Sequence, residues 1–295
     1  MEIHQLTYFV AVAQTGSFSR AAEQCLVTQP SLSQQIIKLE QELGEQLFDR
    51  LHRRVVLTEA GRILLPRANL ILSEVNDIKL RLTDDIKEGR GLLSVGFIPT
   101  IAPFVLPRTI KRFAESFPHA RLMVQEDLTE NLVRELVDGK IDVAITSLPI
   151  HNDQIQTIEL RTEPLLVASA VENLMNRQAS ILVKELEEYP FIALNEMHCL
   201  GAQVQDFCYK ANLDIKIVCN TTQLSTVQRC VALGLGVSLV PQAQAALDTT
   251  GRISYRALTD ANPERKIAAA IHKDRRQSYL AQQFIEIVRD EYGNA

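Results

Sequence analysis

The fold of the first part of this chain is decided by residues 28–44, which read TQPSLSQQIIKLEQELG. Thr28 is of a type that caps helix N-termini, and Pro30 is tolerated in a first helical turn, where its missing N–H would have no partner. Gly44 is of the type that ends helices in the left-handed conformation. The segment therefore predicts a helix that begins near residue 29 and ends near residue 43.

Two further helices are predicted upstream of this one. Apolar residues recur at helical spacing from Leu6 to Ala13, and the pattern stops at Gly16. Ser17 then stands where it caps a second, short helix over residues 19–26. Two short helices joined by a tight turn, the second of them beginning with polar side chains, are typical of a helix-turn-helix.

The third predicted helix has an apolar face and a polar face. The apolar positions, which we expect to be buried, are Leu32, Ile36, Ile37 and Leu39. The candidate DNA-binding residues on the other side are Gln29, Pro30, Ser31, Ser33, Gln34 and Lys38. Polar side chains of these types meet base edges and phosphates in the DNA major groove. On periodicity alone, a small helical domain with a solvated polar face is the alternative.

A basic and β-prone stretch follows from Arg50 to Thr58 and predicts a wing beside the third helix. Its candidate phosphate contacts are Arg50, Arg53 and Arg54. Between residues 50 and 67 five Arg stand against one Glu, a local balance of +4 in a chain with a net charge of −5. The chain therefore has one basic segment although its net charge is negative.

These features form one continuous pattern from residue 16 to residue 61. Its members are Gly16-Ser17-Phe18, Ala21-Ala22, residues 28–36, Leu39-Glu40, Leu43-Gly44, Leu47-Phe48, Arg50 and residues 57–61. The pattern resembles the N-terminal winged helix-turn-helix of LysR-type transcriptional regulators. The resemblance implies a DNA-binding domain over residues 1–58, double-stranded DNA with a palindromic operator as the target, RNA polymerase as a partner, and a homo-oligomer that is a dimer of dimers.

Residues 59–90 are predicted to form a dimerisation helix and a hinge. Apolar residues step by four and three along it, as in the seam of a coiled coil: Leu64, Ala68, Ile71, Val75, Ile78 and Leu82. Pro66 inside this pattern is expected to remove one backbone hydrogen bond. A lone amphipathic helix packed on its own domain is the alternative. The charged stretch over residues 84–91 is expected to be the hinge.

From residue 91 onward, short β-rich runs alternate with helical patterns, as over residues 91–98, 106–116 and 121–126. The alternation predicts a parallel α/β architecture with ligands at the carboxyl ends of the strands. The family resemblance adds a periplasmic-binding-protein-like effector domain of two α/β subdomains over residues 91–295. Subdomain I is expected over 91–163 and 267–295, and subdomain II over 164–266. The whole chain is thus expected to be a multidomain protein of the α+β and α/β classes.

Two cysteines stand nine positions apart in residues 196–209, which read EMHCLGAQVQDFCY. The residues alone leave open that Cys199 and Cys208 are buried apolar side chains. The CxxC spacing of a zinc site is absent, so no metal is expected. The stretch resembles that of the peroxide-sensing LysR-type regulators, in which a reactive cysteine follows a His.

This second resemblance implies that hydrogen peroxide oxidises Cys199 to a sulfenic acid, which Cys208 converts to a disulfide. The implied peroxide pocket consists of Thr100, Thr129, His198 and Arg265. Gly201 departs from the family, where Arg is common, and leaves open how tightly the loop is held. If residues 199–208 form one regular helix, the two cysteine Cα atoms lie about 13 Å apart, and a disulfide, which needs about 7 Å, requires local unfolding.

Composition limits the other function classes. The chain of 295 residues has no apolar run of about 18 residues and no secretory pattern at its start, so a cytoplasmic protein without membrane contact is expected. Cys25, Cys219 and Cys230 are expected to be core residues. No nucleotide-binding loop or catalytic triad is present, so neither an enzyme nor a cofactor is expected. A LysR-type regulator that responds to a small metabolite is the alternative function.

Overall fold

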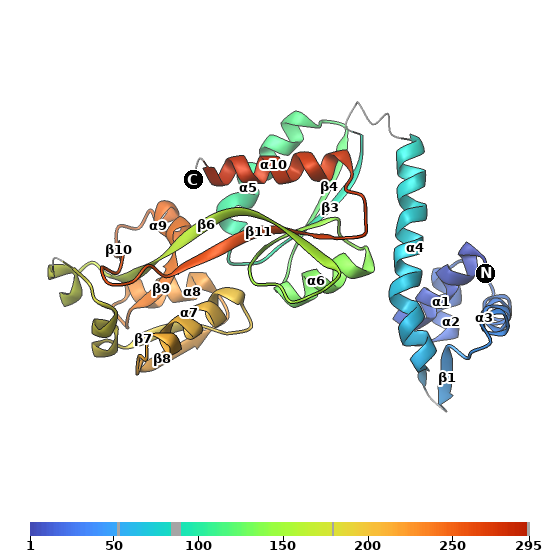
Figure 1. Ribbon diagram of the computed structural model, residues 1–295, viewed down its shortest axis with the longest axis horizontal. Helices are drawn as coiled ribbons and strands as arrows, with labels where there is room; N and C mark the ends of the chain where they lie inside the picture. Colours follow the sequence, from blue (N-terminus) through green and yellow to red (C-terminus); the bar gives the residue numbers. More distant parts are fainter. Residues whose placement is uncertain (52–53, 84–89, 179, 294–295) are drawn as a thin grey trace. The chain divides into compact units, whose positions relative to one another are not determined.

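The computed structural model describes residues 1–51, 54–83, 90–178 and 180–293. The chain forms two compact units, one consisting mainly of residues 1–87 and the other mainly of residues 88–295 (Figure 1). Among the described residues, no helix combines the length and the apolar character that a membrane crossing requires.

The first unit is a winged helix-turn-helix followed by a long helix. Its elements are α1 (Ile3–Thr15), α2 (Phe18–Gln24), α3 (Gln29–Leu43), β1 (Phe48–Leu51), β2 (Arg54–Leu57) and α4 (Glu59–Thr83). Gly16 ends α1 with a φ of 63°, and the Ser17 and Thr28 side chains accept hydrogen bonds from backbone N–H groups in the first turns of α2 and α3. β1 and β2 pair antiparallel as the wing. The predicted helix-turn-helix and wing are confirmed.

The core of this unit corrects one expectation about α3. Leu32, Ile36 and Leu39 are fully buried in the cluster shared with α1, but Ile37 is 40% exposed. Successive residues on a helix point about 100° apart, so a stripe that follows residues 32, 36 and 39 leaves Ile37 on its outer edge. Ile37 therefore belongs to the solvent-facing side of α3.

Helix α4 is continuous through Pro66. Two of its predicted seam residues pack on the core of their own unit: Ala68 is fully buried there and Leu64 lies against the same cluster. Ile71 is exposed and Val75 is half-buried. Pairing of two chains along α4 remains a prediction. Outside the described residues lie Arg53 and the side chains of Arg50, Arg54, Ile78 and Leu82.

The second unit is built from nine strands and six α-helices among the described residues. The strands are β3 (Gly91–Phe97), β4 (Ala120–Glu126), β5 (Val143–Ser147), β6 (Ile155–Ala170), β7 (Phe191–Leu194), β8 (Ile217–Thr221), β9 (Ser238–Pro241), β10 (Ile253–Arg256) and β11 (Glu264–His272). The helices are α5 (Ala102–Ser116), α6 (Thr129–Asp138), α7 (Cys199–Lys210), α8 (Leu224–Ala232), α9 (Gln242–Leu247) and α10 (Tyr279–Gly293), with 3-10 turns at η1 (Leu174–Arg177) and η2 (Val183–Glu188).

Seven of these strands form a mixed sheet in the order β10, β6, β11, β5, β3, β4, with β9 also paired to β6, while β7 and β8 pair separately. β3 is parallel to β4 and β5, but β11 is antiparallel to β5 and β6. The sheet is therefore mixed, so the parallel arrangement predicted from the alternation holds for β3, β4 and β5 and not for β6 and β11. β6 and β11 are the long strands that carry the chain from one half of the unit to the other and back, so they run in opposite directions.

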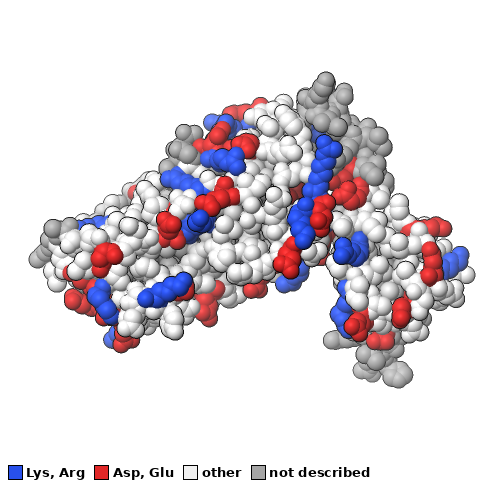
Figure 2. Space-filling model, viewed as in Figure 1, with Lys and Arg blue, Asp and Glu red and all other residues white. Residues whose placement is uncertain are grey.

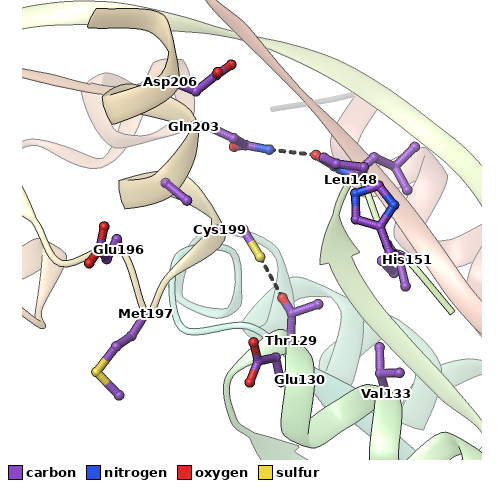
Figure 3. A pocket seen from close by; sticks show the side chains of 13 residues that line it. Thr129, Glu130, Val133, Leu148, His151, Glu196, Met197, Cys199, Gln203 and Asp206 are labelled. Atoms are coloured by element: carbon purple, nitrogen blue, oxygen red, sulfur yellow. Dashed lines mark hydrogen bonds between the residues drawn. The ribbon is translucent and has the colours of Figure 1, made fainter. Parts of the chain in front are cut away.

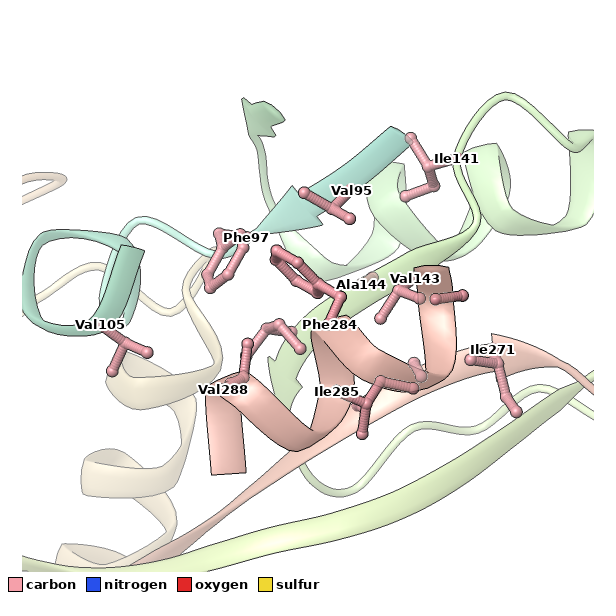
Figure 4. Packing of buried hydrophobic residues seen from close by; sticks show 14 of the residues in the cluster. Val95, Phe97, Val105, Ile141, Val143, Ala144, Ile271, Phe284, Ile285 and Val288 are labelled. Carbon is pink, nitrogen blue, oxygen red and sulfur yellow. The ribbon is translucent and has the colours of Figure 1, made fainter. Parts of the chain in front are cut away.

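Each half of the second unit has its own apolar core. In the first half, Phe284 of α10 meets Phe97 of β3 edge to face, with ring centroids 6.1 Å apart (Figure 4). Phe284 also meets Phe113 of α5 edge to face, with ring centroids 5.7 Å apart. In the second half, the side chains around β7, β9 and α7 form a separate cluster that includes Phe191 and Leu200. The two halves meet along β6 and β11, so a cleft between them has one wall from each.

Candidate functional site

The polar face of α3 is available to a partner. Gln29, Pro30, Ser31, Gln34 and Lys38 are exposed and Ser33 is half-buried. Acidic and basic side chains are interspersed across the face of the second unit drawn in Figure 2, with uncharged areas between them.

The start of α7 brings two predicted residues together. Cys199 is the first residue of α7 and follows the N-cap residue His198. Its Sγ lies 2.7 Å from Oγ1 of Thr129, the first residue of α6, and either group can donate the hydrogen bond (Figure 3). Because α6 and α7 belong to different halves of the second unit, this contact spans the cleft between them.

Cys199 is half-buried and lines a cavity of about 600 Å³. The cavity is lined from α6 by Thr129, Glu130 and Val133, from the segment after β5 by Leu148, Pro149, Ile150 and His151, and from the α7 side by Glu196, Met197, Cys199, Ala202, Gln203 and Asp206. A small polar oxidant thus has room to reach the sulfur from solvent.

One turn further along α7, Gln203 makes a second connection across the cleft. Its Nε2 donates to Oγ of Ser147 at 2.9 Å and to the carbonyl oxygen of Leu148 at 2.6 Å. Residues four apart on a helix share a face, so Gln203 stands beside Cys199. Sequence reasoning missed this residue, although its spacing of four from Cys199 was a usable signal.

Cys208 lies in the opposite environment. Nine residues are about two and a half turns, so Cys208 is on the face of α7 turned away from Cys199. Its side chain packs in the apolar cluster of the second half, and the residue is only 4% exposed. Burial raises the pKa of the Cys208 thiol to about 11. At neutral pH this thiol is therefore protonated and out of reach.

Gly201 is required by the packing of the first turn of α7. A Cβ at this position would lie 2.2 Å from the carbonyl oxygen of Asn195 and 2.5 Å from that of Leu194. The helix therefore rests directly on the backbone that leads into it. The sequence left the tightness of this loop open, and the structure answers that Gly201 permits a close fit that Arg does not.

The other predicted pocket residues lie elsewhere along the cleft. Thr100 and His198, both buried, line a second cavity of about 420 Å³. The loop before α8 and α8 itself contribute Thr222, Gln223, Leu224, Ser225 and Gln228 to it, and the remaining lining residues are Pro99, Pro103, Phe104, Glu126, Gln244 and Leu247. His198 and Cys199 are consecutive in the chain but line two different cavities.

Arg265 is not among the lining residues of either cavity. It is 2% exposed, and its Nε donates to Oε2 of Glu163 at 2.7 Å. Its two terminal nitrogens donate to Oγ1 and to the carbonyl oxygen of Thr100, at 3.2 Å and 3.1 Å. Glu163 also accepts a hydrogen bond from the backbone N–H of Ala243 in α9. The ion pair therefore joins β6, β11 and the Thr100 loop behind the second cavity.

The remaining cysteines are free and half-buried: Cys25 in the first unit, and Cys219 and Cys230 in the second. They lie at the edges of cores rather than inside them, unlike the sequence expectation. Within the part of the chain that the structure describes, no three His, Cys, Asp or Glu side chains gather as a metal site.

Two family descriptions match the chain: "Bacterial regulatory helix-turn-helix protein, lysR family" over residues 3–62 and "LysR substrate binding domain" over residues 87–293. The chain is 34% identical over 241 residues to the DNA-binding transcriptional dual regulator OxyR of Escherichia coli, covering 82% of this chain and 79% of that protein.

Solved structures agree with these matches. A full-length OxyR variant from Pseudomonas aeruginosa is 30% identical to this chain and superposes on it with a TM-score of 0.78. The superposition covers 99% of this chain and 94% of the other. A hydrogen-peroxide-bound mutant of Corynebacterium glutamicum OxyR is also 30% identical, with a TM-score of 0.65 over 99% and 94% of the two chains. The similarity thus extends across both units.

Proposed function

The chain belongs to the LysR family of bacterial regulators, and we propose that it controls transcription in response to hydrogen peroxide through a reversible switch between Cys199 and Cys208. The observation that carries this proposal is the contact of Cys199 with Thr129 at the mouth of a cavity, with Cys208 buried on the far side of the same helix. The relatives support the same signal, since several of them are named hydrogen peroxide-inducible genes activators.

The first step is oxidation of Cys199. Its thiolate attacks one oxygen of hydrogen peroxide, the O–O bond breaks, and the departing hydroxide takes up the thiol proton as water. Cys199 is left as a sulfenic acid. The Thr129 hydroxyl lies within hydrogen-bond distance of this sulfur and can donate to it, which holds the sulfur at the start of α7.

The second step needs α7 to unwind. A regular helix holds the Cα atoms of Cys199 and Cys208 about 13 Å apart, and a disulfide needs them within about 7 Å. Once released from its cluster, the Cys208 sulfur attacks the sulfenic sulfur, the S–O bond breaks, and the hydroxyl leaves as water with the Cys208 proton. The buried, protonated Cys208 is thereby kept from reacting before the helix opens.

Unwinding α7 also breaks the contacts that join the two halves of the second unit. The Cys199–Thr129 contact and the two hydrogen bonds of Gln203 all depend on α7 being helical. Their loss frees the halves to rearrange, and a change of packing in one subunit is the kind of event that shifts a subunit interface. We infer that this rearrangement respaces the DNA-binding units of a dimer of dimers.

The DNA-binding half of the proposal rests on the first unit. Polar side chains from Gln29 to Lys38 read base edges, and the wing residues Arg50, Arg53 and Arg54 contact phosphates. The α4 helices of two chains pair and present two such units to a palindromic operator. The partners are therefore double-stranded DNA, further copies of the chain and RNA polymerase, and the site of action is the bacterial cytoplasm, where the DNA lies. No catalysed turnover and no cofactor are part of the proposal.

A second candidate is a regulator that responds to a small metabolite. The observation that favours it is the 420 Å³ cavity around Thr100 and His198, which is large enough for a small polar molecule. In this case Cys199 and Cys208 would be incidental, and DNA affinity would follow the ligand rather than the oxidant.

Non-reducing peptide mapping of the full-length protein after stoichiometric peroxide separates the two candidates. The proposed switch requires a peptide pair linked through Cys199 and Cys208 that disappears on reduction, together with a change in the DNA footprint without added metabolite. If no such linkage forms while every peptide is recovered, the peroxide switch is wrong and the metabolite-responsive regulator takes its place.

A further inference from the structure

The cavity beside Cys199 carries charge of one sign. Its lining includes the acidic residues Glu130, Glu196 and Asp206, and no Lys or Arg is among its lining residues. Asp206 forms an ion pair with Lys210 at 2.6 Å, so its charge is offset. Within the part of the chain that the structure describes, Glu130 and Glu196 have no such cationic partner. Two uncompensated carboxylates therefore face a reactant that enters this cavity.

Both carboxylates belong to residues close to the reacting sulfur. Glu130 follows Thr129, whose Oγ1 lies 2.7 Å from Sγ of Cys199. Glu196 precedes Cys199 by three residues, on the segment that leads into α7 (Figure 3). These separations are on the order of the Debye length at physiological salt, about 8 Å, so the two charges act on a reactant at the sulfur.

We propose that Glu130 and Glu196 make the cavity selective by charge, so that uncharged and cationic reactants reach Cys199 and anionic ones are disfavoured. Hydrogen peroxide is uncharged at neutral pH, and its approach is unaffected by the two carboxylates. Oxidants and thiols that carry a carboxylate or sulfonate group meet charge of their own sign. This selectivity names the class of reactant that the Cys199 switch accepts, and it rests on the proposed function.

The size of the cavity gives charge selectivity a consequence. A volume of about 600 Å³ is that of sites that hold small organic molecules, so size alone does not exclude a small thiol. Such a thiol can attack the sulfenic sulfur of oxidised Cys199, with cleavage of the S–O bond, loss of water and formation of a mixed disulfide. Repulsion of anionic thiols leaves more of the sulfenic acid to Cys208.

Two small disulfides of similar size and opposite charge test the selectivity in full-length protein. Cystamine carries two ammonium groups, and 3,3′-dithiodipropionate carries two carboxylates. With either probe, the Cys199 thiolate attacks one sulfur, the S–S bond breaks, and the released thiolate takes up a proton. Cys199 is left as a mixed disulfide, which peptide mapping without reduction quantifies over time.

The measured quantity is the ratio of the cystamine rate to the dithiodipropionate rate at Cys199. Both probes react with the same thiolate, so this ratio does not depend on how much of the thiol is ionised. The measurement is made at low salt and at pH 8, where imidazole groups such as that of the lining residue His151 ordinarily carry no charge.

The double variant Glu130→Gln, Glu196→Gln is expected to lower this ratio several-fold. The wild-type ratio should also fall as salt is added, because the Debye length shortens from about 30 Å at 0.01 M to about 3 Å at 1 M. The control is Glu172→Gln, Glu188→Gln, which makes the same change of net charge at exposed positions outside the lining of both cavities. Its ratio should equal that of the wild type.

An equal ratio in the wild type and the Glu130, Glu196 variant overturns the proposal, and so does an equal fall in the control variant. Absence of any cystamine adduct on Cys199 also overturns it, because the cavity would then not admit a cationic reactant. The peroxide switch is judged separately, by the Cys199–Cys208 linkage that hydrogen peroxide forms in the wild-type protein. Either proposal can therefore fail without the other.

Discussion

The two ends of α7 are held by different chemistry. At the start of the helix, Cys199 and Gln203 make polar contacts with the other half of the second unit, beside a cavity open to solvent. Towards its end, Val204 and Cys208 pack into the apolar core of their own half. The side of α7 that carries Cys199 is thus polar and accessible, while the side that carries Cys208 is protected and packed in the apolar core.

This difference explains how one helix can carry both thiols of a switch. A thiol that meets the oxidant first has to be reachable, and a thiol that completes the disulfide has to stay unreactive until then. The opposite faces of α7 provide both conditions within nine residues. The cost is that the disulfide needs the helix to open, so oxidation is converted directly into a change of structure.

The largest expected effect comes from removing the accessible thiol. Cys199→Ser should abolish the peroxide-induced change in the DNA footprint, because no sulfenic acid forms at the start of α7 for Cys208 to resolve. Cys25→Ser in the first unit is the matched control and should respond as the wild type does. A footprint that still shifts in Cys199→Ser would mean that the accessible end of α7 is not the sensor.

The protected end is tested by pH. Burial raises the pKa of Cys208 to about 11 from 9.0, so the thiolate is favoured in the unfolded chain and disfavoured in the fold. The stabilisation from the buried thiol is therefore complete below pH 9 and is lost as the pH rises to about 11. Two pKa units correspond to about 3 kcal/mol.

Denaturant titrations at pH 8 and pH 11 measure this effect. The free energy of unfolding should fall between these pH values by more in the wild type than in Cys208→Ala, which has no thiol to ionise. Equal decreases in the two proteins would show that Cys208 is not held in an apolar environment.

The support beneath α7 is tested at Gly201. A Cβ there meets two backbone carbonyl oxygens, which cannot move as a flexible side chain does. Gly201→Ala should lower the free energy of unfolding by about 2 kcal/mol, as overpacking does in a well-packed site. Ala202→Ser, at the exposed neighbouring position, is the control and should be near neutral. A stable Gly201→Ala protein would contradict the close fit of the first turn.

Sequence reasoning reached the first unit more fully than the second because the decisive residues there act locally. Gly16 ends a helix, and Ser17 and Thr28 cap helices by contacts with backbone groups a few residues away in the chain. Their roles can therefore be predicted from the sequence. Ile37 was misjudged because one step along a helix is enough to leave a buried stripe. The sequence left the tightness of the loop at Gly201 open because it does not show the Leu194 and Asn195 carbonyl oxygens that lie against this residue.

The second unit depends on contacts between residues far apart in the chain. Thr129 and Cys199 are separated by 70 positions, and Glu163 and Arg265 by 102. The family resemblance supplied Thr129 and Arg265 as site residues, but it did not indicate that Arg265 binds Glu163 behind Thr100. The first part of β6 is hard to predict from the sequence, because its residues are partly exposed and lack a continuous apolar run. Its partner β11 is reached only after the chain has crossed the other half and returned.

The smallest expected effect concerns the polar connection made by Gln203. Gln203→Leu removes two hydrogen bonds to Ser147 and Leu148 that hold α7 to the other half of the unit. Such bonds contribute about 1 kcal/mol each to stability, so the reduced arrangement is loosened while the core packing around Cys208 is retained. At fixed peroxide, the Cys199–Cys208 linkage should therefore form several-fold faster than in the wild type, as measured by quenching the reaction and mapping peptides without reduction. Gln205→Leu, on the exposed side of the same helix, should leave the rate unchanged. A slower reaction in Gln203→Leu would mean that this amide serves the oxidation of Cys199 itself, and the contrast between an accessible polar side and a packed apolar side of α7 would have to be given up.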